Sequence, residues 1–193
     1  MQDHDALLQR RKAVAWVLTL TEKTRLAPDS YEQQLLTRYA QGEIALDDIP
    51  QLLASRVHHI LYRSRATRPL SEAELTELVT HSRPYNTYRD ITGLLCYSEG
   101  HFVQFLEGPE ASVLELYATI QCDPRHEQIE TLSNTAGPTR WFADWRMVLV
   151  TAPPPEFYWL LSHLEARDAQ LVMPQRPITN QHLLTLLQAF SKS

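Results

Sequence analysis

The chain has 193 residues, which suits one ordinary domain with additions or two small domains. Its apolar fraction of 44% can supply a hydrophobic core, and its formal net charge is −5 with no long run of one sign. A clustered basic face typical of nucleic-acid binding is missing, and no apolar stretch has the length of a bilayer span. The two cysteines, Cys96 and Cys122, form no Cys-x-x-Cys pair, so neither a metal site nor a disulfide framework is expected. We therefore predict a cytoplasmic protein that binds neither nucleic acid nor membrane.

The N-terminal segment, residues 1–55, has a helical pattern. Apolar residues at helical spacing indicate one amphipathic helix over 7–18 and a second that begins near Asp29 and ends at Gly42. A short third helix carries Ile49, Leu52 and Leu53. No strand-like alternation occurs here, so we predict a helical extension that serves as an interaction or dimerisation element.

The central segment, residues 56–151, mixes strand and helix signals. Strands are predicted over residues 57–62, 90–97, 101–107, 128–132 and 145–150. Ser71 and Glu74 form a possible capping box at the start of one helix, and Gly108-Pro109-Glu110 starts another. Ser98-Glu99-Gly100 predicts a hairpin turn. The order βαββαββ predicts an α+β fold with a ferredoxin-like sheet and one extra strand.

Both faces of the two central strands are apolar. Alternation places one set of side chains on one face, namely Ile91, Gly93, Leu95, Tyr97, Phe102, Gln104 and Leu106. It places the other set on the opposite face, namely Thr92, Leu94, Cys96, Val103 and Phe105. The two internal helices can cover only one face. We assign helices predicted over 157–164 and 179–190, within a C-terminal cap of residues 152–193, to the second face, with the N-terminal helices as further candidates.

Several residues of the central segment could bind a ligand, although each also has a structural explanation. Gln104 lies among apolar residues on a face expected to be buried, where its amide needs partners from the backbone or from a polar heteroaromatic ligand. Tyr62 suits a core position, and Asn86, just past a predicted helix, suits a cap or turn. Trp145 and Met147 are two residues apart on the last strand and are expected to face the same way.

Taken together, these residues resemble a known family. The string Ile91-Thr92-Gly93-Leu94-Leu95, followed by Gly100-His101-Phe102-Val103-Gln104-Phe105-Leu106-Glu107-Gly108, closely resembles the BLUF family of flavin-binding blue-light sensors. The resemblance keeps its order and spacing over 57–151 through Tyr62-Arg63-Ser64, Asn86, Asp123-Pro124-Arg125-His126 and Phe142-Ala143-Asp144-Trp145-Arg146-Met147.

The resemblance implies roles in photochemistry and flavin binding. Tyr62 matches the tyrosine that gives an electron and then a proton to the excited flavin, and Gln104 matches the glutamine whose amide then rearranges. Asn86 matches the asparagine that hydrogen-bonds the carbonyl and imide edge of the ring, while Arg125 and His126 match residues beside the ring. The implied cofactor is FAD, with FMN and riboflavin as alternatives.

The resemblance also implies an output. Trp145 and Met147 match the strand pair that exchanges position or hydrogen bonding with the glutamine during signalling. The last strand and the C-terminal helices would carry the change onward. We therefore predict a non-enzymatic blue-light photoreceptor that forms a homo-oligomer and acts on a separate effector protein.

Three alternatives remain open. A flavin-free ferredoxin-like interaction scaffold would keep the fold without the photochemistry, but the presence of both Tyr62 and Gln104 argues against it. An antitoxin-like regulatory module would place the function in the N-terminal helices, whose pattern around 31–44 weakly resembles such modules but lacks the inhibitory motif expected of some of them. A small hydrolase would need a Ser–His or Cys–His pair, and the sequence indicates none.

Overall fold

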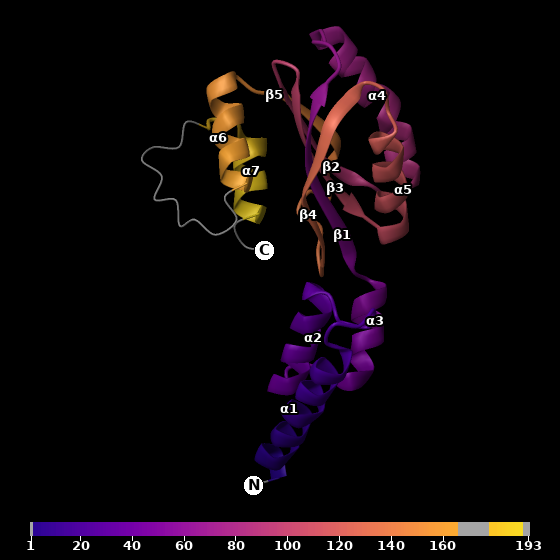
Figure 1. Ribbon diagram of the computed structural model, residues 1–193, viewed down its shortest axis with the longest axis vertical. Helices are drawn as coiled ribbons and strands as arrows, with labels where there is room; N and C mark the ends of the chain where they lie inside the picture. The colour runs from indigo at the N-terminus through magenta and orange to yellow at the C-terminus, as the bar shows by residue number, and fades with distance from the viewer. Residues whose placement is uncertain (1, 166–177, 191–193) are drawn as a thin grey trace. The chain divides into compact units, whose positions relative to one another are not determined.

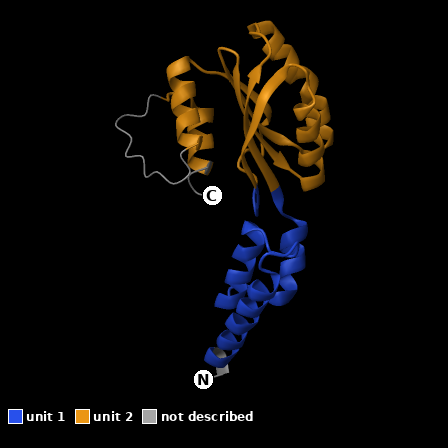
Figure 2. Cartoon of the chain, viewed as in Figure 1, with its two compact units in different colours: residues 1–57, 135–139 blue, residues 58–134, 140–193 orange. Residues whose placement is uncertain are grey.

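The computed structural model describes residues 2–165 and 178–190. The chain forms two compact units, one of residues 1–57 with 135–139 and one of residues 58–134 with 140–193 (Figure 2). The predicted C-terminal cap includes residues 166–177 and 191–193, which lie outside the described residues. Within the described ranges, no helix is both long and apolar enough to cross a membrane.

The first unit is helical, as predicted. It contains α1 (Gln2–Thr21), α2 (Ser30–Gln41), the short 3₁₀ helix η1 (Leu46–Asp48) and α3 (Ile49–Ala54). Helix α2 begins at a capping box, in which the Asp29 side chain accepts the Glu32 N–H at 2.8 Å and the Glu32 side chain accepts the Asp29 N–H at 2.9 Å. Gly42 ends α2 with a φ of 82°, a left-handed conformation that glycine adopts without a steric penalty.

The first unit has its own small core. Tyr31 and Leu35 from α2 are buried together with Ile44, and Ala136 packs against them. Arg10 ties α1 to the end of α2 by donating a hydrogen bond to the carbonyl of Ile44 at 3.1 Å. The apolar face of α2 is therefore covered within this unit.

Among its described residues, the second unit contains a five-stranded sheet and four helices. In chain order these are β1 (Val57–Ala66), α4 (Glu72–Tyr88), β2 (Thr92–Ser98), β3 (His101–Gly108), α5 (Glu110–Gln121), β4 (His126–Gly137), β5 (Arg146–Thr151), α6 (Pro154–Glu165) and α7 (Gln181–Phe190). The strand order across the sheet is β4-β1-β3-β2-β5. Strand β3 runs antiparallel to both β1 and β2, and β5 runs parallel to β2. The predicted ferredoxin-like βαββαββ order is confirmed.

Helices cover both faces of the sheet, with α4 and α5 on one side and α6 and α7 on the other (Figure 1). Phe102 and Leu106 pack on the α4–α5 face, whereas Val103 and Phe105 pack on the α6–α7 face. The two faces predicted from alternation are thus confirmed, and the C-terminal helices cover the second one.

The β2–β3 hairpin has the predicted turn. Ser98 pairs with His101, and the two residues between them, Glu99 and Gly100, have φ values of 45° and 84°. Positive φ at both central positions matches the two-residue turn whose twist suits a hairpin. Strand β1 runs further than predicted, to Ala66, whose N–H donates to the carbonyl of Gly100 at 2.7 Å.

A bulge at Met147 changes which residues of β5 face which helices. Gly93 pairs with Arg146 but Leu94 pairs with Val148, so Met147 is an extra residue in the ladder, with a φ of 67°. Met147 consequently packs on the α4–α5 face, whereas Trp145 packs on the α6–α7 face. The prediction that the two side chains face the same way is wrong, because the bulge interrupts the strand alternation between them.

Candidate functional site

A buried chain of hydrogen bonds joins β1, β3 and β5 on the α4–α5 face. The Tyr62 hydroxyl donates to Oε1 of Gln104, its cross-strand partner, and Nε2 of Gln104 donates to the sulfur of Met147 at 3.2 Å. Gln104 is 8% exposed, and the other two side chains are more deeply buried. Both ends of the glutamine amide therefore have buried partners, one a strong hydroxyl donor and the other a weak thioether acceptor.

Tyr62 lies between the sheet and α5. Its ring is 5.1 Å from that of Tyr117, whose hydroxyl is 2.7 Å from the hydroxyl of Thr131. Burial raises the pKa of Tyr62 well above its ordinary value, and Tyr117 and Asp123 raise it further. The phenol is therefore protonated at neutral pH and donates to Gln104.

Asn86 has unmet hydrogen-bonding capacity. It lies within the last turn of α4, not beyond the helix as predicted, and is 1% exposed. Among the described residues, neither its side-chain oxygen nor its side-chain nitrogen has a hydrogen-bond partner. Buried amides in native proteins are normally satisfied. The edge of a flavin ring, a carbonyl oxygen beside an imide N–H, offers the complementary donor and acceptor, so this residue fits a flavin.

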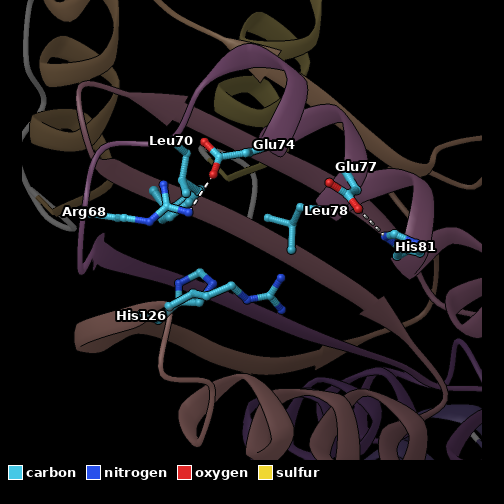
Figure 3. A pocket seen from close by; sticks show the side chains of 9 residues that line it. Arg68, Leu70, Glu74, Glu77, Leu78, His81 and His126 are labelled. Carbon is cyan, nitrogen blue, oxygen red and sulfur yellow. Dashed lines mark hydrogen bonds and ion pairs between the residues drawn. The ribbon is translucent and has the colours of Figure 1, made fainter.

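A cavity of about 250 Å³ opens on the same face (Figure 3). Its lining comprises Arg68, Leu70, Glu74, Glu77, Leu78, His81, Phe102, Arg125 and His126. On the α4 side Arg68 pairs with Glu74 at 2.6 Å and His81 lies 3.9 Å from Glu77. Two of the predicted flavin residues, Arg125 and His126, thus line this cavity together with the apolar side chains of Leu70, Leu78 and Phe102.

Asp123 orients Arg125 at this cavity. The guanidinium donates from Nε at 2.9 Å and from Nη2 at 2.5 Å to the Asp123 carboxylate. This pairing holds the pKa of Asp123 below its usual range and raises that of Arg125. Arg125 is therefore a fixed cation at the cavity wall.

His126 forms an unpredicted pair with a serine. Its Nδ1 lies 2.9 Å from Oγ of Ser64, and its ring is 4.8 Å from that of Phe102. Burial lowers the pKa of His126, although the Asp123 carboxylate opposes the shift. The sequence had indicated no Ser–His pair, so this contact corrects that reading. Asp123 binds Arg125 instead of orienting the histidine, so Asp123 does not complete a hydrolytic triad with this pair.

Trp145 lies on the opposite face of the sheet from Gln104. Its ring stacks on Phe142 at 4.5 Å and meets the edge of His182 from α7 at 4.7 Å. The structure therefore brings Met147, but not Trp145, to the glutamine. The relay role that the family resemblance implies for both residues stays a prediction.

Two residues that contribute to this arrangement were missed from the sequence. Tyr117 packs against Tyr62 from α5, a contact between distant segments that no local pattern indicates. Glu107 is completely buried near the end of β3, where it accepts the backbone N–H groups of Trp141 and Phe142. The available signal was its position two residues after Phe105, which places an acid on a buried face.

Known proteins resemble the chain over this same region. Residues 57–148 match the BLUF family model, described as sensors of blue-light using FAD. The BLUF protein BlrB in its dark state has a TM-score of 0.52 and 31% identity, over 70% of this chain and 98% of that one. BlsA in its photo-activated state has a TM-score of 0.50 and 26% identity, over 68% of this chain and 91% of that one.

Curated relatives match over a small share of their own length. Photoactivated adenylate cyclase subunit beta of Euglena gracilis is 36% identical over 102 residues, which is 49% of this chain and 12% of that subunit. The blue light- and temperature-regulated antirepressor BluF of Escherichia coli (strain K12) is 36% identical over 90 residues, 47% of this chain and 22% of that protein. The family match, the relatives and the fold agree: the chain belongs to the BLUF family of blue-light sensors.

Proposed function

We propose that this chain binds FAD on the α4–α5 face and senses blue light through Tyr62 and Gln104. The buried hydrogen-bond chain from Tyr62 through Gln104 to Met147 is the observation that carries the proposal. The unpaired amide of Asn86 supports it, as does the cavity lined by Arg125 and His126. FMN and riboflavin contain the same ring and would meet the same residues.

The photochemical roles follow from the residue types. A bound flavin supplies blue-light absorption and, once excited, an acceptor for an electron. Tyr62 is the donor, because a phenol can lose an electron and a proton together, and its hydroxyl already points its proton at Oε1 of Gln104. Glutamine has one acceptor end and one donor end, so protonation or rotation of the amide changes what it presents to Met147.

The size of this change is enough for signalling. Losing one buried hydrogen bond costs about 1–3 kcal/mol. A difference of that size shifts a two-state equilibrium by roughly one or two powers of ten. The bulged start of β5 is the element that would respond, since Met147 contacts Gln104 and Trp145 contacts α7.

We further propose that the chain performs no reaction of its own and acts as a homo-oligomer on a separate protein in the cytoplasm. The Escherichia coli relative is named an antirepressor, which is a protein that opposes a repressor. The hydrogen-bonded side chains of Tyr62, Gln104 and Met147 suit a reversible hydrogen-bond switch and include no activated nucleophile.

Absorption spectroscopy of the purified full chain tests the proposal. The protein should show a flavin spectrum and a reversible red shift after blue illumination, because a stronger hydrogen bond to the ring carbonyl lowers the transition energy. Tyr62→Phe should keep the flavin and lose the shift, since it removes the hydroxyl but retains the ring. Tyr88→Phe makes the same chemical change at an 87% exposed position and should leave the shift intact.

Two results would contradict the proposal. A colourless protein that also fails to take up added FAD, FMN or riboflavin would exclude a flavin sensor. A normal red shift and recovery in Tyr62→Phe would show that Tyr62 is not the donor.

A further inference from the structure

Glu107 lies at the centre of a buried polar network on the α6–α7 side of the sheet. Its Oε1 accepts the Phe142 N–H at 2.7 Å and the Thr92 hydroxyl at 2.8 Å, and its Oε2 accepts the Trp141 N–H at 2.6 Å. The side chain of His59 lies 3.6 Å from Oε2. Burial raises the pKa of Glu107, and the three donated hydrogen bonds oppose this because they favour the carboxylate.

Two arginines fix the ends of the segment 140–146, whose residues 141 and 142 are bound by Glu107. Nη2 of Arg140 donates to both the carbonyl and the carboxylate of Asp90 at 2.6 Å, and its Nη1 donates to the Thr92 hydroxyl at 2.9 Å. Nη1 of Arg146 donates to the other Asp90 oxygen at 2.9 Å. Residues 140–146 are thus bound at both ends to Asp90, in the short connection between α4 and β2.

The segment between these contacts decides where Trp145 and Met147 point. Phe142, whose N–H is bound by Glu107, carries the ring on which Trp145 stacks. The Trp145 carbonyl accepts the N–H groups of Gly93 at 2.9 Å and Met147 at 2.7 Å, which forms the bulge. Met147 has a left-handed backbone conformation there. This conformation is unfavourable for a residue with a side chain, so it persists only where surrounding contacts hold it.

We propose that Glu107 is a positioning residue for the light response: by holding Trp141 and Phe142 it keeps Trp145 against α7 and Met147 against Gln104. Its carboxylate does not touch the Gln104 side, since Glu107 and Phe105 lie on the opposite face of β3. It acts instead through the backbone that leads into β5. The proposal rests on the proposed function, because it assigns a role within the same light-sensing site.

Glu107→Gln tests this role. The amide keeps the size of the side chain but replaces one acceptor oxygen with a donor, which then faces a backbone N–H in either orientation. Amide exchange at Trp141 and Phe142 should accelerate in the dark by about tenfold, as expected for one lost hydrogen bond to a charged acceptor. Return to the dark spectrum after blue light should slow by up to about tenfold, because its end state loses the same contact.

Matched variants separate positioning from general stability. Glu115→Gln makes the same chemical change in an exposed ion pair with Arg89 and should change neither rate. Phe142→Leu keeps an apolar side chain but removes the ring beneath Trp145, so it should slow recovery of the dark spectrum. This variant tests the role even if Glu107→Gln does not fold. The double variant of Glu107 and Phe142 should recover no more slowly than the slower single variant, because both changes act through one contact.

The outcomes are distinct. Faster exchange together with slower recovery supports the role of Glu107. Faster amide exchange with an unchanged recovery rate overturns it, and so does an unchanged exchange rate. Where Glu107→Gln does not fold, a normal recovery rate in Phe142→Leu overturns it. A wild-type chain that binds flavin but shows no red shift would instead overturn the proposed function, and the positioning role with it.

Discussion

Replacing Asn86 with leucine should raise the stability of the flavin-free chain and lower its affinity for flavin. The side chain is 1% exposed, and both of its polar atoms are buried without partners among the described residues. Leucine has the same number and branching of side-chain heavy atoms and no polar atoms, so it removes two unmet hydrogen-bonding groups without opening a cavity. The same change removes the amide that would bind the edge of the flavin ring.

The magnitudes follow from the hydrogen bonds. A buried polar group without a partner costs about 1–3 kcal/mol, so Asn86→Leu should raise the unfolding free energy of the flavin-free chain by about 2 kcal/mol. Leucine also has the higher helix propensity, which adds a few tenths of a kcal/mol within α4. Two lost hydrogen bonds to flavin, at about 0.5–1.5 kcal/mol each, should weaken flavin binding by roughly tenfold to a hundredfold.

Urea unfolding of the flavin-free chain and titration with FAD, followed by the quenching of flavin fluorescence, measure the two effects. Thr87→Leu is the matched control, since Thr87 is the exposed next residue of α4 and has a similar helix propensity to asparagine. The control should leave FAD affinity unchanged and reproduce only the propensity gain. Reduced stability of flavin-free Asn86→Leu together with wild-type affinity would refute the assignment of this amide to the flavin.

Two further predictions concern the output and the N-terminal unit. Met147→Ala and Trp145→Ala should each still bind flavin but weaken the light-dependent change in hydrogen exchange of α6 and α7, because Met147 contacts Gln104 and Trp145 contacts α7 at the two ends of the proposed route. Undiminished changes in both variants would exclude β5 as the route. Amides of α2 should exchange slowly in the dark, since Tyr31 and Leu35 are buried in the core of the first unit. Complete exchange of residues 1–55 within seconds would show that this core does not form in solution.

Local patterns in the sequence determined the elements, and the family resemblance named the candidate site residues. Alternation in β2 and β3 gave the correct faces because side chains of a strand alternate strictly while the ladder is regular. The capping boxes and the Glu99-Gly100 turn were predictable because each depends on neighbouring residues only. The spacing from Tyr62 to Gln104 indicated their roles by family resemblance, and the register that places them opposite each other is consistent with it.

Tertiary structure alone decided the direction of Trp145 and Met147, the environment of Asn86 and the hydrogen-bond partners of Glu107. The bulge at Met147 depends on how β5 pairs with β2, a strand distant in sequence, and a period of two cannot reveal it. The unmet amide of Asn86 is likewise a property of its neighbours in space. Sequence patterns report which residues prefer burial, whereas hydrogen-bond partners are set by segments that meet only when the chain has folded.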